Sequence, residues 1–421
     1  MRQSIAICLL VAISGCSKQA PVAPAAAGSG GVSVPSPAGA GAAATSDSEG
    51  VAGFGPDDVG ASAGSSAGTG GSEPSQAGAP AAGESAAGRA GGSSGASGMA
   101  APAGAAGEMT TTSTTDSACP FDLVGFATVE GGTSGGGNLE PTRVTTQAEL
   151  RACATAAEPR VCLVQGTLTF EPFEEIDVKS DKTILGSGAT AEIVMGGFRL
   201  NAGVHNVIIR NLTIRDSYIE GQYDEGGDDG GDRDGVQLDT AHHVWIDHVH
   251  FKHLGDGMID SRKDTTFLSV SWNILEHHNK AFGIGWTDNV TAQLTIHHNW
   301  IHDTVQRNPS TDNVLRAHLF NNLLEDVESY GNYSRGMTNM VLQNSVFTRV
   351  NDPHYYDTGS LIATGNIYRS TKGRKVATGD TFSSFDPGKF YRYELDSAED
   401  AETIVKRCAG PRPDLGRLTN L

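Results

Sequence analysis

Short runs in which apolar and polar residues alternate recur through the second half of the chain. Each run has five to ten residues, is rich in β-branched and aromatic side chains, and is bounded by Gly, Asp, Asn or Pro. This pattern is typical of short β-strands. The best helical pattern is at residues 145–157, where a helix would be capped near Thr145. The strand runs are NVIIRNLTIR (206–215), HVWIDHVHF (243–251), FLSVSWNILE (267–276), QLTIHHNWIH (293–302), AHLFNNLLED (317–326), NMVLQNSVF (339–347) and SLIATGNIY (360–368).

One polar position repeats from run to run. Successive asparagines are separated by 26, 23, 22 and 22 residues, and His248 stands 25 residues before the first of them. Short strands with a period in the low twenties predict a solenoid, and a repeated amide predicts a ladder of side chains at a bend. We therefore predict an all-β fold, a single-stranded right-handed parallel β-helix with a short N-terminal helix cap. A β-sandwich is the alternative, but it does not require the repeat. The asparagines are Asn273, Asn299, Asn322, Asn344 and Asn366.

The first 117 residues predict no folded domain. Residues 17–117 are almost entirely Ala, Gly, Ser, Pro and Thr, too poor in large apolar side chains to fold, and indicate a disordered tether. Residues 1–16 contain Arg2, a short apolar run and then Ser-Gly-Cys, which resembles a bacterial lipoprotein signal with Cys16 as the lipidated residue. An ordinary signal peptide is the alternative. We expect an exported protein, anchored at the outer membrane or cell surface only through the lipid, with its folded domain at residues 118–421.

Four cysteines remain in the predicted domain. An even number in an exported protein predicts disulfides. We favour a short loop closed by Cys153–Cys162 and a bond between the two ends of the domain, Cys119–Cys408, although four cysteines allow three pairings.

The net charge of −19 argues against nucleic acid as a partner. It also means that an acidic ligand would need a local cation in order to bind. The charged residues that repeat between coils are therefore the candidates for chemistry.

Two groups of acids are separated by about one coil. Asp232 and Asp234 precede the run at 243–251, while Asp256 and Asp260 follow it, with Arg262 two residues further on. In an extended segment, residues two apart point to the same side. Stacked carboxylates repel one another unless a hard cation binds them, and Ca²⁺ is the usual choice for carboxylate sites. The alternative is that the Gly-Asp-Gly at 255–257 is only a turn.

Two basic residues extend the pattern. Lys280 lies 20 residues after Asp260, again about one coil, and Arg307 precedes Asn308 and Pro309. By themselves, such residues are usually solvated surface charges.

The motifs HVWIDH, GDGMIDSRK, SVSWN, HHNK, TIHHNWI and QRNP, followed by AHLFNN, occur here in the order of the signature segments of pectate lyases of polysaccharide lyase family 1. The resemblance runs from about residue 125 to about residue 368. It implies β-elimination of polygalacturonate, the acidic plant cell-wall polymer, to 4,5-unsaturated products by a Ca²⁺-dependent enzyme that we expect to act as a monomer.

The resemblance also implies roles for individual residues. Calcium would be bound by Asp234, Asp256 and Asp260, with Asp232 nearby. Lys280 and Arg262 would bind substrate, and Arg307 would remove the C5 proton. The family pattern continues with two further arginines after the proline, but here Pro309 is followed by STDNVLRAH. Arg316 is the nearest substitute and is predicted to bind substrate. This departure leaves open an inactive pectin-binding β-helix. The acidic cluster leaves open a hydrolytic enzyme, since hydrolysis needs two carboxyl groups.

Overall fold

The chain winds into a right-handed parallel β-helix, as predicted. The computed structural model describes residues 119–219, 233–375 and 385–416, all of which belong to one unit at residues 106–421. The predicted lipid anchor at Cys16 and the predicted tether lie outside the described residues. Within the described part of the chain, no helix is long and apolar enough to span a membrane.

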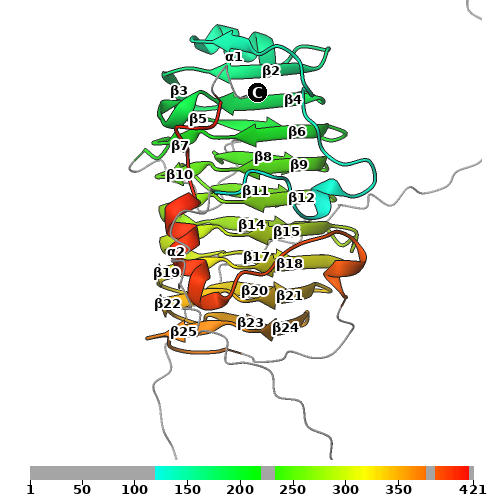
Figure 1. The fold of residues 1–421 in the computed structure, drawn as a ribbon, viewed down its shortest axis with the longest axis vertical. Helices are drawn as coiled ribbons and strands as arrows, with labels where there is room; N and C mark the ends of the chain where they lie inside the picture. Colours follow the sequence, from blue (N-terminus) through cyan, green and yellow to red (C-terminus); the bar gives the residue numbers. More distant parts are fainter. Residues whose placement is uncertain (1–118, 220–232, 376–384, 417–421) are drawn as a thin grey trace, which may run out of the picture. The chain divides into compact units, whose positions relative to one another are not determined.

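Every strand pairing is parallel, and successive coils stack along the solenoid (Figure 1). One sheet has ten strands, each contributed by a different coil. Its members are β1 (Thr142–Val144), β2 (Arg160–Val164), β4 (Lys182–Gly186), β6 (His205–Arg210), β9 (His242–Asp247), β12 (Thr266–Ser271), β15 (Gln293–His297), β18 (Arg316–Phe320), β21 (Asn339–Gln343) and β24 (Ser360–Thr364).

The second sheet has fifteen strands and divides into two arms at β5 (Glu192–Leu200), which also pairs with β3 (Thr167–Asp177). We call the arms the β8 arm and the β7 arm. The β8 arm contains β8 (Val236–Asp239), β11 (Ile259–Arg262), β14 (Phe282–Gly285), β17 (Ser310–Asp312), β20 (Asn332–Arg335) and β23 (His354–Tyr356). The β7 arm contains β7 (Thr213–Arg215), β10 (His250–Lys252), β13 (Ile274–Lys280), β16 (Trp300–Gln306), β19 (Leu323–Val327), β22 (Val346–Val350) and β25 (Ile367–Arg369).

The interior is filled by rows of aliphatic side chains. Ile246, Val270, Ile296 and Leu319 occupy equivalent positions in four successive coils and are all buried. Burial of a whole strand face in every coil provides most of the free energy that holds the solenoid together. Because the apolar side chains face inward, polar side chains can occupy the outward positions of the β8 arm.

The asparagine ladder forms, with two corrections. The Asn299 amide donates to Asn322 and accepts from Asn273, and Asn366 continues the row. Ser345, rather than Asn344, occupies the rung between Asn322 and Asn366. His248 is also one residue away from the row, because the backbone nitrogen of Val249 binds the Asn273 side chain.

The residue before each rung has a left-handed backbone conformation. Here φ is 51° at His248, 55° at Trp272, 53° at His298, 50° at Asn321 and 47° at Asn344. The first three rings stack on one another, with centroids 6.1 Å and 4.2 Å apart. Asparagine tolerates this conformation well, which explains why it also occurs beside the ladder.

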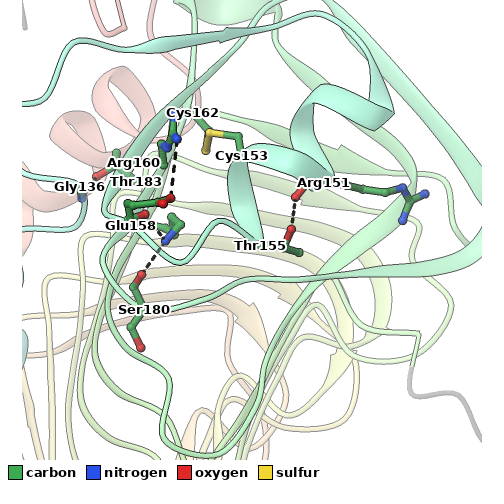
Figure 2. The surroundings of a disulfide bond; sticks show 10 residues. Gly136, Arg151, Cys153, Thr155, Glu158, Arg160, Cys162, Ser180 and Thr183 are labelled. Carbon is green, nitrogen blue, oxygen red and sulfur yellow. Dashed lines mark hydrogen bonds and ion pairs between the residues drawn. A yellow bond between two sulfur atoms is a disulfide. The ribbon is translucent and has the colours of Figure 1, made fainter.

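Helix α1 (Gln147–Ala154) lies at one end of the solenoid and helix α2 (Ala398–Cys408) lies along its side (Figure 1), and a disulfide ties each of them down. Helix α1 is capped by Thr146, one residue later than predicted, and Thr146 and Glu149 form a capping box. The Cys153–Cys162 disulfide joins α1 to β2 (Figure 2). Helix α2 packs on β19 and β22, and its last residue forms a disulfide with Cys119. The structure thus has the two pairings favoured from the sequence. Short 3₁₀ helices occur at Phe126–Thr128, Gly188–Thr190 and Pro387–Lys389.

Acidification is expected to destabilise the fold through buried histidines. Burial lowers the pKa of His318 to about 4, and it lowers the pKa of His297 and His298 too. Below about pH 6.5 these histidines become protonated in the unfolded chain but stay neutral in the native state. Stability is therefore fully present above pH 6.5 and falls as the pH approaches 4, by about 3 kcal/mol for His318 alone.

The measurement is urea unfolding between pH 7 and pH 4. His318 contacts Gln343 and Tyr391 through its two ring nitrogens, so His318→Gln keeps a polar side chain that does not titrate. The variant should show a flatter dependence of unfolding free energy on pH than the parent. Parallel curves would show that His318 does not control this dependence.

Candidate active site

Two of the candidate residues, Asp260 and Arg262, lie on strand β11 of the β8 arm. Backbone pairing sets Gln237, Asp260 and Gly283 side by side on three successive strands, with Ile259 facing the core. A second row, two residues further along each strand, contains Asp239, Arg262 and Gly285. The β-helix therefore converts a separation of about 23 residues in sequence into neighbouring positions on one face.

Asp234 and Asp260 are brought together around Gly257. The Gly257 backbone nitrogen donates to Asp234 Oδ1 at 2.7 Å. A Cβ atom built on Gly257 would lie 2.6 Å from Asp260 Oδ1 and 2.9 Å from Asp234 Oδ1, so a side chain there would collide with both carboxylates. Asp234 and Asp260 are only 2% and 4% exposed. Two neighbouring buried carboxylates repel each other strongly unless a cation compensates their charge.

The donor chemistry of this pair fits a hard divalent cation, because carboxylate oxygens are what Ca²⁺ prefers. Among residues 119–219, 233–375 and 385–416 no group of three His, Cys, Asp or Glu side chains converges closely enough to hold a metal. The fourth acid predicted from the sequence, Asp232, lies outside the described residues.

Asp256 is directed to Lys280. Its Oδ1 accepts a hydrogen bond from Lys280 Nζ at 2.7 Å, and the two side chains are 22% and 12% exposed. Lys280 is the last residue of β13, where it pairs with Gln306, so it enters the site from the β7 arm. The structure thus joins the predicted substrate-binding lysine to one of the predicted calcium ligands.

Arg307 follows β16 in the next coil. Its backbone has a φ of 59°, and its carbonyl accepts a 2.6 Å hydrogen bond from the Phe282 nitrogen, which attaches it to the start of β14. The Arg307 guanidinium lies 5.4 Å from the centre of the Trp286 ring. Lys280 and Arg307 therefore come from adjacent coils on the same side of the solenoid.

Trp286 was missed by the sequence analysis. It follows β14, is 37% exposed, and places its ring against Gly283, the neighbour of Asp260. A cation over an indole ring is attracted by the ring quadrupole, so Trp286 restrains the Arg307 side chain. The only sequence signal was an aromatic residue directly after Gly283, Ile284 and Gly285.

Arg262 lies on the predicted face, but in an ion pair. Its Nε is 2.9 Å from Asp239 Oδ1, and Lys263 Nζ is 2.9 Å from Asp239 Oδ2. Substrate would have to share or replace these contacts.

Arg316 lies apart from the other candidate residues that the structure describes. Arg316 begins β18 in the ten-stranded sheet, not in the β8 arm. Its guanidinium donates to Gln293 Oε1 at 2.8 Å and lies 4.5 Å from the centre of the Phe390 ring. Between β17 and β18 the chain bends from one sheet into the other. Arg316 lies after this bend, so it does not take the place of a residue of the candidate site.

The two positions where the family pattern has arginines are occupied by short side chains. Ser310 and Asp312 are the first and last residues of β17, which pairs with β14 and β20. Asp312 Oδ2 lies 3.4 Å from Arg335 Nε of the next coil, and burial raises the pKa of Asp312. The Arg335 guanidinium therefore lies near Asp312, but it comes from β20 rather than from β17.

The described part of the chain is thus a parallel β-helix with carboxylates and cations on one outward face. The Pectate lyase family model matches residues 96–406, and the chain belongs to this family of polysaccharide lyases. A pectate trisaccharide-lyase from Thermotoga sp. is 32% identical over 345 residues, covering 71% of this chain and 90% of the relative. A pectate trisaccharide-lyase from Bacillus licheniformis is 28% identical, covering 69% of this chain and 86% of the relative.

Solved structures share the fold. A pectate lyase from Bacillus sp. N165, crystallised with trigalacturonate, is 25% identical with a TM-score of 0.58, covering 69% of this chain and 99% of its own. A Bacillus subtilis pectate lyase mutant is 18% identical with a TM-score of 0.60, and supports the fold alone.

Proposed function

We propose that this protein is a pectate lyase that cleaves α-1,4-polygalacturonate by calcium-assisted β-elimination, releasing 4,5-unsaturated oligogalacturonides. The observation that carries the proposal is that Lys280 and Arg307 lie on the same face of a pectate lyase family β-helix as the buried acid Asp260. Each group has a task in this reaction.

Lys280 would neutralise the C6 carboxylate of the sugar at which the bond breaks. The C5–H next to that carboxylate is weakly acidic, and the negative charge that develops on proton removal needs a nearby cation. The Lys280 ammonium is largely buried, which strengthens its electrostatic effect relative to an exposed lysine. Its present partner, Asp256, holds it on the correct side of the strand.

Arg307 would accept the C5 proton. The electron pair then forms the C4–C5 double bond, the C4–O bond breaks, and the leaving oxygen takes up a proton. Because a guanidinium loses its proton only at strongly alkaline pH in water, we expect the reaction to be faster in alkaline solution.

Asp234, Asp260 and Asp256 would hold calcium, with Asp232 as the fourth predicted ligand. Bound there, the ion supplies Lewis-acid neutralisation of a substrate carboxylate. It also explains how a protein with a net charge of −19 could bind an acidic polymer.

A second candidate function is binding of the polymer without cleavage. Ser310 and Asp312 favour it, since they occupy positions where the family pattern has cations.

For location, we propose that the protein is exported and attached to the membrane through a lipid on Cys16. Mass spectrometry of the mature N-terminus would test this.

An elimination assay distinguishes these functions. Polygalacturonate at alkaline pH with Ca²⁺ should yield products with the ultraviolet absorbance of a conjugated double bond, and a chelator should remove at least about nine-tenths of the rate. Excess Ca²⁺ should restore the rate. Binding of polymer with no unsaturated product would support the second candidate, and reducing ends without absorbance would indicate hydrolysis.

A further inference from the structure

Two tyrosines continue the outward row that contains Asp260. Backbone pairing runs from Asp260 to Gly283 and Ser310, and then to Tyr333 on β20 and Tyr355 on β23. Figure 1 shows β11, β14, β17, β20 and β23 following one another along the same face. Neighbouring strands are about 4.8 Å apart, so Tyr333 lies three strands, roughly 14 Å, from Asp260.

These tyrosines belong to a stack of rings and cations. The Tyr333 and Tyr355 rings are stacked, with centroids 4.2 Å apart and planes 25° from parallel. The Arg335 guanidinium lies 5.6 Å from the centre of the Tyr333 ring, and the Arg374 guanidinium lies 3.6 Å from the centre of the Tyr355 ring. We call these four residues the tyrosine–arginine stack.

The stack is fixed in place by its neighbours. Arg374 makes two hydrogen bonds to Asp352 Oδ2, from Nε at 3.0 Å and from Nη2 at 2.7 Å, while its side chain remains 60% exposed. Arg335 is restrained by Asp312. Tyr355 is almost fully covered, whereas Tyr333 is half-buried and next to the small Ser310. A surface that is held rigid in advance loses little side-chain entropy when a ligand binds.

The chemistry of the stack suits an acidic sugar polymer. The C–H face of a pyranose ring packs against an aromatic ring, and a guanidinium pairs with a carboxylate in a charge-assisted, often bidentate geometry. A galacturonate unit carries both features. Arg335 and Arg374 bring two guanidiniums to this part of the surface, and a substrate carboxylate would share them with their aspartate partners.

We propose that the tyrosine–arginine stack is a remote binding site for the same polygalacturonate chain that is cleaved near Arg307. The proposal rests on the proposed function and extends it: the polymer follows the outward row from Asp260 past Trp286 to Tyr333. The stack increases affinity for long chains and takes no part in bond breakage.

The test measures KM and kcat of the full-length protein on polygalacturonate and on trigalacturonate. Tyr333→Ala and Arg374→Gln should each raise KM on the polymer about fivefold or more, with kcat unchanged. KM on trigalacturonate should not change, since a trimer is too short to span three strands on one side of the scissile bond. Tyr333→Phe keeps the ring and should behave like the parent.

Arg349→Gln is the matched control for Arg374→Gln. Arg349 also makes a bidentate pair with an aspartate, Asp326, but on the β7 arm, and its loss should leave both KM values unchanged. If the stack served only to close the end of the solenoid, Tyr333→Ala and Arg374→Gln would lower the melting temperature, and their effect on KM would not depend on the length of the substrate. Unchanged KM on the polymer, or equal changes on both substrates, would overturn the proposal.

If the parent protein produces no unsaturated product, the proposed elimination fails, and the stack is then tested by equilibrium binding of polygalacturonate. Weaker binding by Tyr333→Ala than by the parent would support the stack as a binding site. Equal binding would overturn it.

Discussion

Arg307→Ala is expected to reduce kcat on polygalacturonate by about 10³-fold or more, because general-base catalysis typically contributes 10²–10⁴-fold. KM should change much less, since binding relies on Lys280 and on contacts further along the face. Arg307→Lys should be almost as slow, because a lysine amine cannot reproduce the planar guanidinium that lies over Trp286. The measurement is the initial rate of formation of unsaturated product at saturating polymer and fixed Ca²⁺.

The substitution is suited to this test because the backbone of Arg307, rather than its side chain, is bonded to β14. Both variants should therefore keep the parent's melting temperature within a few degrees. Arg349→Gln, far along the sequence and on the β7 arm, is the control for loss of an arginine. A folded Arg307→Ala variant with more than a tenth of the parent rate would exclude Arg307 as the base.

The fold could be predicted because every coil repeats the same pattern of short strands with one buried side. Alternation identifies strands with one buried side, and the period identifies parallel stacking. The exact rungs of the ladder could not be predicted from asparagine alone. Asparagine is favoured both at the rung and at the preceding left-handed position, so Asn344 resembles a rung although Ser345 forms it.

The site was predictable only as far as backbone register determines it. The spacing of Asp234, Asp260 and Lys280 places them on adjacent coils, and the structure brings these residues to one face. Which way a side chain turns depends on local contacts, and Asp256 bonds Lys280 instead of joining the two buried acids. Trp286 and the tyrosine–arginine stack depend on side chains that meet across coils, which no single run reveals.

Arg316 shows the limit of counting along the chain. Its distance from Pro309 resembled a displaced family position, but a few residues suffice to carry the chain around a bend. Its strand then belongs to another sheet. Charge and approximate spacing were therefore insufficient without the position of the bend.

Asn299→Ala is expected to lower the free energy of unfolding by about 4 kcal/mol, since several buried polar groups would lose their partners at once. Asn299 is 1% exposed. Its Nδ2 donates to the carbonyls of Val270 and His297 and to Asn322 Oδ1, each at 3.0 Å. Its Oδ1 accepts from the Asn273 backbone and side chain at 3.0 and 2.9 Å. Urea unfolding followed by circular dichroism at neutral pH measures the loss.

Asn289→Ala is the matched control, because Asn289 is exposed and bonds only the side chain of Asp264 and the Thr287 hydroxyl. Removing it should cost no more than about 0.5 kcal/mol, as for most surface substitutions. The contrast separates the ladder from the general effect of losing an amide, because water can replace partners at the surface but not inside the bend. Equal losses for the two variants would mean that the stacked amides add little, and that the coils are held together mainly by their aliphatic rows.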